Sequence, residues 1–342
     1  MTGRVSVEAL DRSDPTRIGG RITLRGRLGF GGMGRVYYGV TDDREQVAVK
    51  VIRADLIDRD EVRERFARET EALRTVQGAH IASLVDASDA DDEQPWLAME
   101  FVRGLTLKEF VSERGPLSVE HAAAFGVLLA DALRDVHAAG LLHRDLKPAN
   151  VILGRDGPMV IDLGLVAFAE GPTDLTTSAA TLGTPACMAP EQAVTPKQIT
   201  AAADVHSLGA TLLYALTGHY PYKGDTVVAL MAKIISADAP PDITGLPDAF
   251  TGPVAAMLAH DPHARPTVAK AREALEALCG GVLPAAIRAL TLATYVERES
   301  DPEDVPPPRP RPVDLSQVAP PGSVVARLAD RLRTAYAVTA PF

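Results

Sequence analysis

The chain has 342 residues, of which 46% are hydrophobic and 23% are charged, and its formal net charge is −10 at pH 7. This length and composition are sufficient for a globular protein with a large core in more than one lobe. The negative charge argues against a nucleic acid as the main partner. Its two cysteines, Cys187 and Cys279, lack metal-ligand spacing and form no disulfide framework, which is typical of a reducing compartment.

The N-terminus is polar and charged, without the apolar segment of a signal peptide. No apolar run approaches the length that is needed to span a bilayer. We therefore expect a cytoplasmic protein with no transmembrane segment.

The first motif is the glycine-rich run from Gly29 to Val36, which fits the pattern G-x-G-x-x-G-x-V. Gly29, Gly31 and Gly34 carry no Cβ atom, so the backbone amides of this run can approach phosphate oxygens closely. Dinucleotide-binding folds use a similar pattern, but there the glycines lead from a strand into a helix. Here residues typical of strands lie on both sides, which predicts a β-hairpin over the phosphates of a nucleotide.

Residues 47–50 predict a short apolar strand that ends in Lys50. An isolated lysine at a strand end is usually a solvated surface charge, but after a glycine hairpin we expect Lys50 to reach nucleotide phosphates. A helix is predicted from Asp60 to Val76, and Glu69 lies near its apolar face. We predict an ion pair between Lys50 and Glu69, with a helix-surface glutamate as the alternative.

Residues 97–102 predict a buried strand that leads into the connection between two lobes. Met99 would lie at the back of a pocket for the nucleotide base, and backbone groups of Glu100 and Val102 would bond the base edge. An apolar strand without a role in ligand binding is the alternative. We expect the apolar walls of the pocket to come from Leu28, Val36, Ala48 and Leu153.

The octapeptide HRDLKPAN at residues 143–150 places an acid, a cation and an amide at the spacing that phosphoryl transfer requires. Asp145 can orient a hydroxyl nucleophile, Lys147 can neutralise a transferring phosphate, and Asn150 can hold a divalent metal. Downstream, Asp162 follows a predicted buried strand, where a carboxylate without a partner would be costly. We therefore predict that Asn150 and Asp162 bind Mg²⁺, for which Mn²⁺ can substitute.

Together with GTPACMAPEQA and DPHARPT, these motifs resemble those of bacterial Hanks-type (eukaryotic-like) serine/threonine protein kinases. The resemblance covers about residues 21–279 and implies an α+β, bilobal protein-kinase fold. The small β-rich N-lobe would span about residues 21–102, and the larger, mainly helical C-lobe about residues 103–279. The implied activity is transfer of the γ-phosphoryl group of Mg-ATP to serine or threonine hydroxyls of proteins. A kinase for small molecules and a pseudokinase scaffold remain as alternatives.

The resemblance also implies structural roles for residues around the catalytic loop, which is the HRDLKPAN segment at residues 143–150. Glu191 would pair with a buried Arg265, and Asp204 would brace the catalytic loop. Thr184 would form a hydrogen bond near Asp145 and Lys147. The chain departs from the usual family pattern at three positions that affect packing: Leu163, Cys187 and His206.

A run of hydroxyl side chains extends from Thr173 to Thr181, between the metal-binding motif and Glu191. A phosphate in this loop adds close to two negative charges and can order the loop against an arginine, for which Arg144 is the candidate. We predict autophosphorylation within this run, and a flexible, solvated loop is the alternative. The expected sites are Thr176, Thr177 and Ser178.

Four segments are expected outside the kinase domain: an N-terminal extension at 1–20, a helical extension at 280–298, a Pro-rich acidic linker at 299–323 and an amphipathic helix at 324–342. The linker contains VPPPRPRPV, which favours the polyproline II conformation and serves as a spacer or as a docking peptide for a partner. For the last helix we favour docking on the kinase domain, over a partner protein or an anionic membrane surface. The resemblance also implies a homodimer through the N-lobes.

Overall fold

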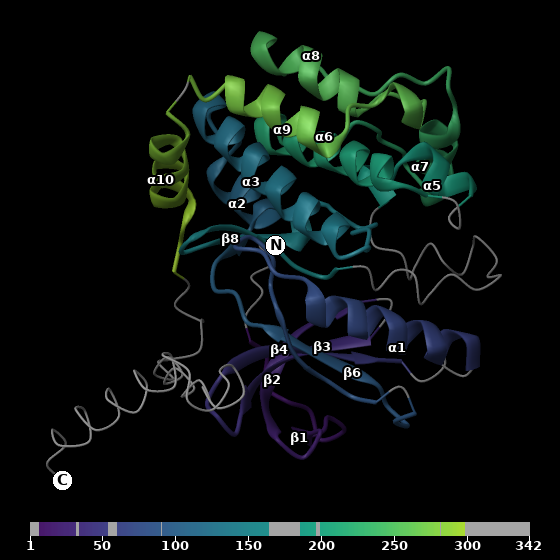
Figure 1. Ribbon diagram of the computed structural model, residues 1–342, viewed down its shortest axis with the longest axis vertical. Helices are drawn as coiled ribbons and strands as arrows, with labels where there is room; N and C mark the ends of the chain where they lie inside the picture. The colour runs from purple at the N-terminus through teal and green to yellow at the C-terminus, as the bar shows by residue number, and fades with distance from the viewer. Residues whose placement is uncertain are drawn as a thin grey trace, which may run out of the picture.

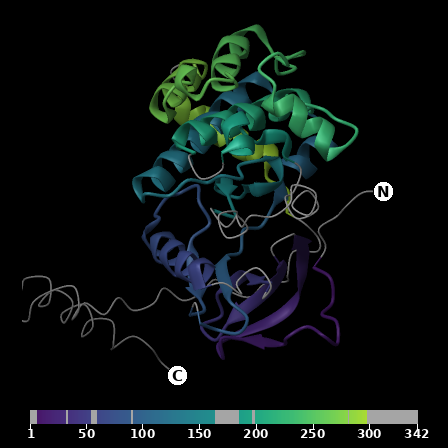
Figure 2. The same ribbon diagram turned by 90° about the vertical axis from the view of Figure 1, so that its right-hand side faces the viewer.

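The computed structural model describes residues 7–31, 34–53, 60–89, 91–163, 185–195, 199–280 and 282–297. These residues form two lobes, one built on a β-sheet and the other mainly on helices (Figure 1). Figure 2, turned by 90°, shows the same division from the side. The predicted α+β bilobal architecture is therefore confirmed.

The sheet lobe contains six strands in the order β1-β2-β3-β4-β6-β5, and each neighbouring pair is antiparallel. The strands are β1 (Arg17–Ile18), β2 (Ile22–Gly31), β3 (Gly34–Thr41), β4 (Gln46–Ile52), β5 (Leu84–Ala87) and β6 (Trp96–Glu100). The glycine-rich run joins β2 to β3 as the predicted hairpin, with Gly31 opposite Gly34. In the register of β3 and β4, Val36 lies opposite Lys50, so the hairpin and the lysine are neighbours.

Helix α1 (Asp60–Thr75) packs against the sheet lobe and ends one residue before the predicted boundary (Figure 1). Its apolar face is the predicted one, because Val62, Phe66 and Leu73 are all buried in the main core. Such spacing places all three side chains on one side of a helix.

The helical lobe is arranged around α3 (Val119–Ala138) and α6 (Ala201–Thr217), which pack against each other. Nearly every residue of α6 is buried, as expected of a helix that is apolar on all sides. Thr200 caps its N-terminus and Gly218 ends it in the left-handed conformation, with φ of 78°. The other helices are α2 (Leu107–Arg114), α5 (Pro190–Val194), α7 (Val227–Ile235), α8 (Asp248–Met257), α9 (Val268–Ala277) and α10 (Leu283–Thr294).

A small sheet between the lobes carries the segment that follows residue 150 and the segment that precedes residue 162, both of which are candidate site residues. It consists of β7 (Leu105–Thr106), β8 (Val151–Gly154) and β9 (Gly157–Val160). The backbone of Val160 also bonds the segment that leads into β5, since its amide donates to the His80 carbonyl at 2.8 Å and its carbonyl accepts from the Ala82 amide at 3.0 Å. These bonds join the two lobes through main-chain atoms.

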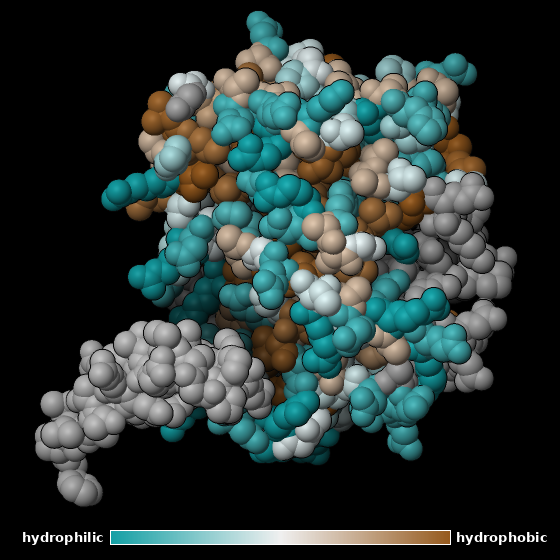
Figure 3. All heavy atoms as spheres, viewed as in Figure 1, coloured by the Kyte–Doolittle hydropathy of each residue, from teal (hydrophilic) through white to brown (hydrophobic). Residues whose placement is uncertain are grey.

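Helix α10 lies within the helical extension that the sequence predicts, and it packs against α3 and β9. Leu290 and Thr294 are buried in this contact, while Val282 and Leu292 are exposed. Figure 3 shows apolar residues gathered over α10. The predicted linker and last helix lie outside the described residues. No helix in the described part of the chain is long and apolar enough to cross a membrane.

The packing of α3 predicts the effect of truncating its core side chains. Leu129 is fully buried in the main core, whereas Leu292 on α10 is 76% exposed. We expect Leu129→Ala to lower the free energy of unfolding by about 2–5 kcal/mol, because it removes buried methyl groups and leaves a cavity. Leu292→Ala is the matched control and should change it by less than about 0.5 kcal/mol. Urea denaturation of the two variants measures the difference, and equal effects would contradict this packing.

Candidate active site

Three side chains of the HRDLKPAN loop converge on one another. The Lys147 ammonium donates to Asp145 Oδ2 at 2.6 Å, and the Asn150 amide donates to the same oxygen at 3.0 Å. Asn150 also donates to the Asp145 backbone carbonyl at 2.8 Å. The Asp145 side chain is 32% exposed, and both side-chain donors use its Oδ2 atom. Asp145 Oδ1 is therefore the oxygen that is available to a hydroxyl group entering from solvent.

An ion pair connects the two lobes at the same site. Lys50 Nζ on β4 donates to Asp162 Oδ1, which follows β9, at 2.8 Å. Burial by itself would raise the pKa of the Asp162 carboxyl, but Lys50, together with Lys147 and His143, holds this pKa below its usual value. Asp162 is thus ionised at neutral pH and remains a strong oxygen ligand.

The predicted partner of Lys50 was a different carboxylate. Among the described residues, Lys50 forms an ion pair with Asp162. Glu69 is half-buried on α1, whereas Glu64 and Glu71 are exposed, so the predicted orientation of the helix is correct. The Lys50–Glu69 pair stays a prediction, because a position on α1 does not by itself give the distance from β4 to each carboxylate.

The metal-binding candidates are held close to each other by the main chain. The Ile161 amide donates to the Asn150 carbonyl at 2.9 Å, which joins the end of β9 to the catalytic loop. Because the Asn150 amide group donates to Asp145, its Oδ1 oxygen is left for a cation. An ionised carboxylate and a carbonyl-type oxygen are the ligands that Mg²⁺ prefers, so Asn150 and Asp162 fit a divalent metal.

The catalytic loop is braced by Asp204 on α6, whose side chain is 1% exposed. Its carboxylate accepts from the His143 amide at 2.9 Å and from the Arg144 amide at 2.8 Å. Arg144 adopts a left-handed backbone with φ of 63°, which is unfavourable for a residue with a side chain. These two hydrogen bonds hold the loop in that conformation, as the sequence predicted for Asp204.

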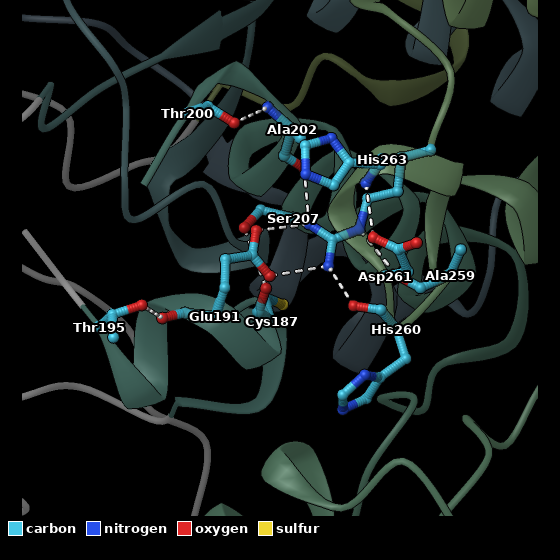
Figure 4. A network of polar contacts seen from close by, with 11 residues as sticks. Cys187, Glu191, Thr195, Thr200, Ala202, Ser207, Ala259, His260, Asp261 and His263 are labelled. Atoms are coloured by element: carbon cyan, nitrogen blue, oxygen red, sulfur yellow. Dashed lines mark hydrogen bonds and ion pairs between the residues drawn. The ribbon is translucent and has the colours of Figure 1, made fainter. Parts of the chain in front are cut away.

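A second buried network fixes α5. Arg265 Nη1 donates to Glu191 Oε1 at 2.6 Å and Arg265 Nη2 donates to Glu191 Oε2 at 2.8 Å, which is a bidentate ion pair (Figure 4). The same guanidinium group donates to backbone carbonyls of Ala259, Ala202 and His260. The Arg265 side chain is fully buried, so every charge-bearing nitrogen needs such an acceptor. The predicted pairing of Glu191 with a buried Arg265 is present.

Two further side chains support the catalytic loop and were not predicted from the sequence, Gln192 by a direct contact and His137 through Asp204. Gln192 Nε2 donates to the Arg144 carbonyl at 2.7 Å, and His137 Nε2 lies 2.7 Å from Asp204 Oδ2. Gln192 directly follows Glu191, and His137 is six positions before His143. No local pattern marks either residue, because their partners are 48 and 67 positions away in the sequence.

The residues expected around the nucleotide base lie on strands of both lobes. Ala48 on β4 is paired with Met99 on β6, and both are half-buried, as are Leu28 and Val36. Leu153 on β8 is fully buried. The Glu100 amide donates to the Ser83 carbonyl at 2.8 Å, so the Glu100 carbonyl is the group that remains for a base.

The three departures from the family pattern all lie in the core. Leu163 is 3% exposed and belongs to the same apolar cluster as Phe66 of α1. Burial raises the pKa of the Cys187 thiol to about 12, which makes it an inert apolar filler. Burial likewise lowers the pKa of His206 to about 3, and neither of its ring nitrogens has a hydrogen-bond partner among the described residues. Thr184 and the hydroxyls Thr176, Thr177 and Ser178 lie outside the described residues.

Comparison with known proteins identifies the motif set. The model of the protein kinase domain family matches residues 22–277 of the chain. The serine/threonine-protein kinase AfsK of Streptomyces griseus is 39% identical over 98% of this chain and 42% of AfsK. The serine/threonine-protein kinase PknB of Mycolicibacterium smegmatis is 33% identical over 86% of this chain and 50% of PknB. The chain thus spans half the length of these relatives or less.

Solved structures show the same fold. The crystal structure of the Mycobacterium tuberculosis PknI kinase domain superposes with a TM-score of 0.60 and 26% sequence identity. The match covers 79% of this chain and 99% of the PknI domain.

Removing the Gln192 contact is expected to destabilise the catalytic loop. Gln192 is 6% exposed, so Gln192→Met keeps most of the side-chain volume but removes the amide group that donates to the Arg144 carbonyl. We expect a loss of about 1–3 kcal/mol in the free energy of unfolding, and a larger loss for Gln192→Glu, whose carboxylate would face that carbonyl. Thr195→Ala, at an exposed position, is the control. Urea titration measures the free energy of unfolding of the parent and of each variant. A Gln192→Met variant as stable as the parent would contradict the prediction.

His206 predicts a specific pH dependence of stability. Its pKa is about 3 in the folded state, and an unfolded histidine titrates near 6.5. Since the unfolded chain binds the proton more readily, stability contributed by neutral His206 is present above pH ~6.5 and is lost as the pH falls towards 3. Between pH 7 and pH 5 we expect the parent to lose about 2 kcal/mol more than His206→Phe.

The measurement is urea denaturation at several pH values, with His263→Gln as the control at an exposed histidine. Parallel pH profiles for the parent and His206→Phe would show that His206 is not held neutral in the folded state.

Proposed function

The chain belongs to the protein kinase family, among the bacterial Hanks-type kinases, and from this premise we propose that it is an ATP-dependent protein serine/threonine kinase. One observation carries the proposal. Lys50 of the sheet lobe contacts Asp162 at 2.8 Å. This contact joins the cation of the sheet lobe to the acid, cation and amide groups of the helical lobe. A scaffold that had lost activity would not be expected to keep all of these groups in contact.

We assign the roles of these side chains from their positions. Asp145 accepts the proton of the substrate hydroxyl on its Oδ1 atom and orients that hydroxyl for attack on the γ-phosphorus. Lys147, held 2.6 Å from Asp145, donates to the transferring phosphoryl group and offsets the charge that develops on it. Lys50 anchors the phosphates of ATP beneath the glycine-rich hairpin, and Glu69 on α1 is proposed to support Lys50 when ATP is bound.

A divalent metal belongs to this chemistry, and Asn150 and Asp162 are the residues that would hold it. Mg²⁺ is our proposal for its identity; when bound, it neutralises charge on the ATP phosphates. The adenine base would lie between Ala48 and Leu153, with Met99 behind it and the Glu100 carbonyl and the Val102 amide at its edge. The positions of Ala48 on β4, of Leu153 on β8 and of Met99 and Glu100 on β6 support this arrangement, and Val102 follows two residues after β6.

Serine or threonine as the acceptor is supported by the two relatives, whose names describe them as serine/threonine kinases, and by Lys147 two positions after Asp145. Autophosphorylation of Thr176, Thr177 or Ser178 remains a prediction, with Arg144 as the phosphate receiver.

The proposal is tested with purified full-length protein and labelled Mg-ATP, followed by mapping of phosphate by mass spectrometry. Asp145→Asn keeps the size of the side chain but removes the proton acceptor. We expect phosphate on serine or threonine in the parent, and a rate at least about 100-fold lower in Asp145→Asn. Asp156→Asn is the matched control, because Asp156 is exposed on the turn between β8 and β9 and should leave the rate unchanged.

Equal labelling of the parent and Asp145→Asn would contradict the role of Asp145. A parent that binds Mg-ATP but labels only a small molecule from a cell extract, and no protein, would contradict protein as the substrate.

A further inference from the structure

Residues 7–16 lie before the part of the chain that matches the kinase family, yet they dock on the glycine-rich hairpin. The Glu8 amide donates to the Arg27 carbonyl at 2.9 Å, and the Arg27 amide donates back to the Glu8 carbonyl at 2.8 Å. The Leu24 amide donates to the Thr16 carbonyl at 2.9 Å. These bonds use the edge of β2 that faces away from β3, so the segment extends the sheet beside the hairpin.

The hairpin is shaped to receive this segment. A Cβ atom on Gly26 would lie 2.3 Å from Val7 Cγ1 and 2.7 Å from the Glu8 carbonyl oxygen, so only glycine allows the approach. The pairing of β2 with β3 shifts register between Leu24 and Gly26 and again between Arg27 and Gly29. At these bulges the backbone of β2 bonds the N-terminal segment in addition to β3.

The N-terminal segment contacts the hairpin most strongly through one buried carboxylate, that of Asp14. The Asp14 side chain has no exposed surface, and Asp14 Oδ2 accepts from Arg27 Nε at 2.6 Å and from the Asp11 amide at 2.7 Å. Asp14 Oδ1 accepts from Arg35 Nη1 at 3.0 Å and from the Tyr37 hydroxyl at 2.9 Å. Arg27 belongs to β2, whereas Arg35 and Tyr37 belong to β3. Asp14 therefore cross-links both strands of the hairpin.

The cross-link lies at the two ends of the glycine-rich run. Arg27 is two positions before Gly29, and Arg35 directly follows Gly34. Gly34 itself approaches β4 so closely that a Cβ atom there would lie 1.9 Å from the Val51 carbonyl oxygen. Any shift of the two strand ends would move the glycine amides relative to Lys50, one position before Val51.

We infer that residues 7–16 form a latch that sets the position of the glycine-rich hairpin over the ATP phosphates, with Asp14 as its positioning residue. The inference rests on the proposed function, since it assumes that the hairpin covers ATP. The hydrogen bond from Arg27 is the main reason that the pKa of Asp14 lies well below its usual range. The carboxylate of the latch is consequently ionised, and paired with both arginines, at neutral pH.

The test is a titration of full-length protein with Mg-ATP by calorimetry, at a temperature well below the unfolding transition of every variant. Asp14→Asn removes the charge that pairs with Arg27 and Arg35 but keeps the size of the side chain. We expect it to bind Mg-ATP about tenfold more weakly and to raise KM for ATP similarly, with kcat changed less than about threefold. Gly26→Ala, which displaces Val7 without altering Asp14, should weaken binding in the same direction.

Asp42→Asn is the matched control, because Asp42 forms an exposed ion pair with Arg17 on β1 at 2.9 Å and should leave the affinity within twofold. If Asp14→Asn and Gly26→Ala lowered the melting temperature but bound Mg-ATP like the parent, residues 7–16 would be a purely structural addition and the inference would be wrong. If the parent itself bound no Mg-ATP, the proposed function would fail first, and the inference with it.

Discussion

The buried carboxylate of Asp204 is the constraint on which the geometry of the site depends. Left-handed backbone at Arg144 costs free energy, and without acceptors for the His143 and Arg144 amides the loop would relax into another conformation. Asp204 supplies both bonds from α6, a helix that is buried on nearly every side and has little freedom to move. The direction of Asp145, the next residue, is thereby set from the centre of the helical lobe.

The site is completed by Lys50 from the sheet lobe and by Asp162, which follows the end of β9. Asp162, like Arg144, has a left-handed backbone, with φ of 64°, and it is positioned by the Ile161–Asn150 bond on one side and by Lys50 on the other. Because Lys50 lies on β4 beside the glycine-rich hairpin, a movement between the lobes changes the Lys50–Asp162 distance directly. With Lys50 as the proposed anchor of the ATP phosphates, nucleotide binding and the relative position of the lobes would be coupled through this ion pair.

The sequence predicted the features that a motif carries within a few positions, and the family resemblance added two contacts between distant residues. The glycine hairpin, the apolar face of α1, the bracing role of Asp204 and the Glu191–Arg265 pair were all predicted, the last two through family resemblance. The contact of Lys50 with Asp162 was not predicted, because Glu69 and Asp162 are both suitable carboxylates and only distances distinguish them. The roles of Gln192, His137 and Asp14 were missed for a related reason. Each residue contacts groups that only the fold brings near, and no local spacing in the sequence indicates the contact.

The departures at Cys187, just before α5, and at His206, on α6, are tolerated because other groups anchor the segments that these two residues occupy. The Ser207 hydroxyl donates to the Cys187 backbone carbonyl at 2.9 Å, a contact that does not depend on the side chain at position 187. The helix that follows is fixed by Arg265 through both oxygens of Glu191. A protonated thiol and a neutral imidazole therefore only need to fill volume. The Ser207 hydrogen bond and the Arg265–Glu191 ion pair, and not an aromatic side chain, hold residues 187–191 in place.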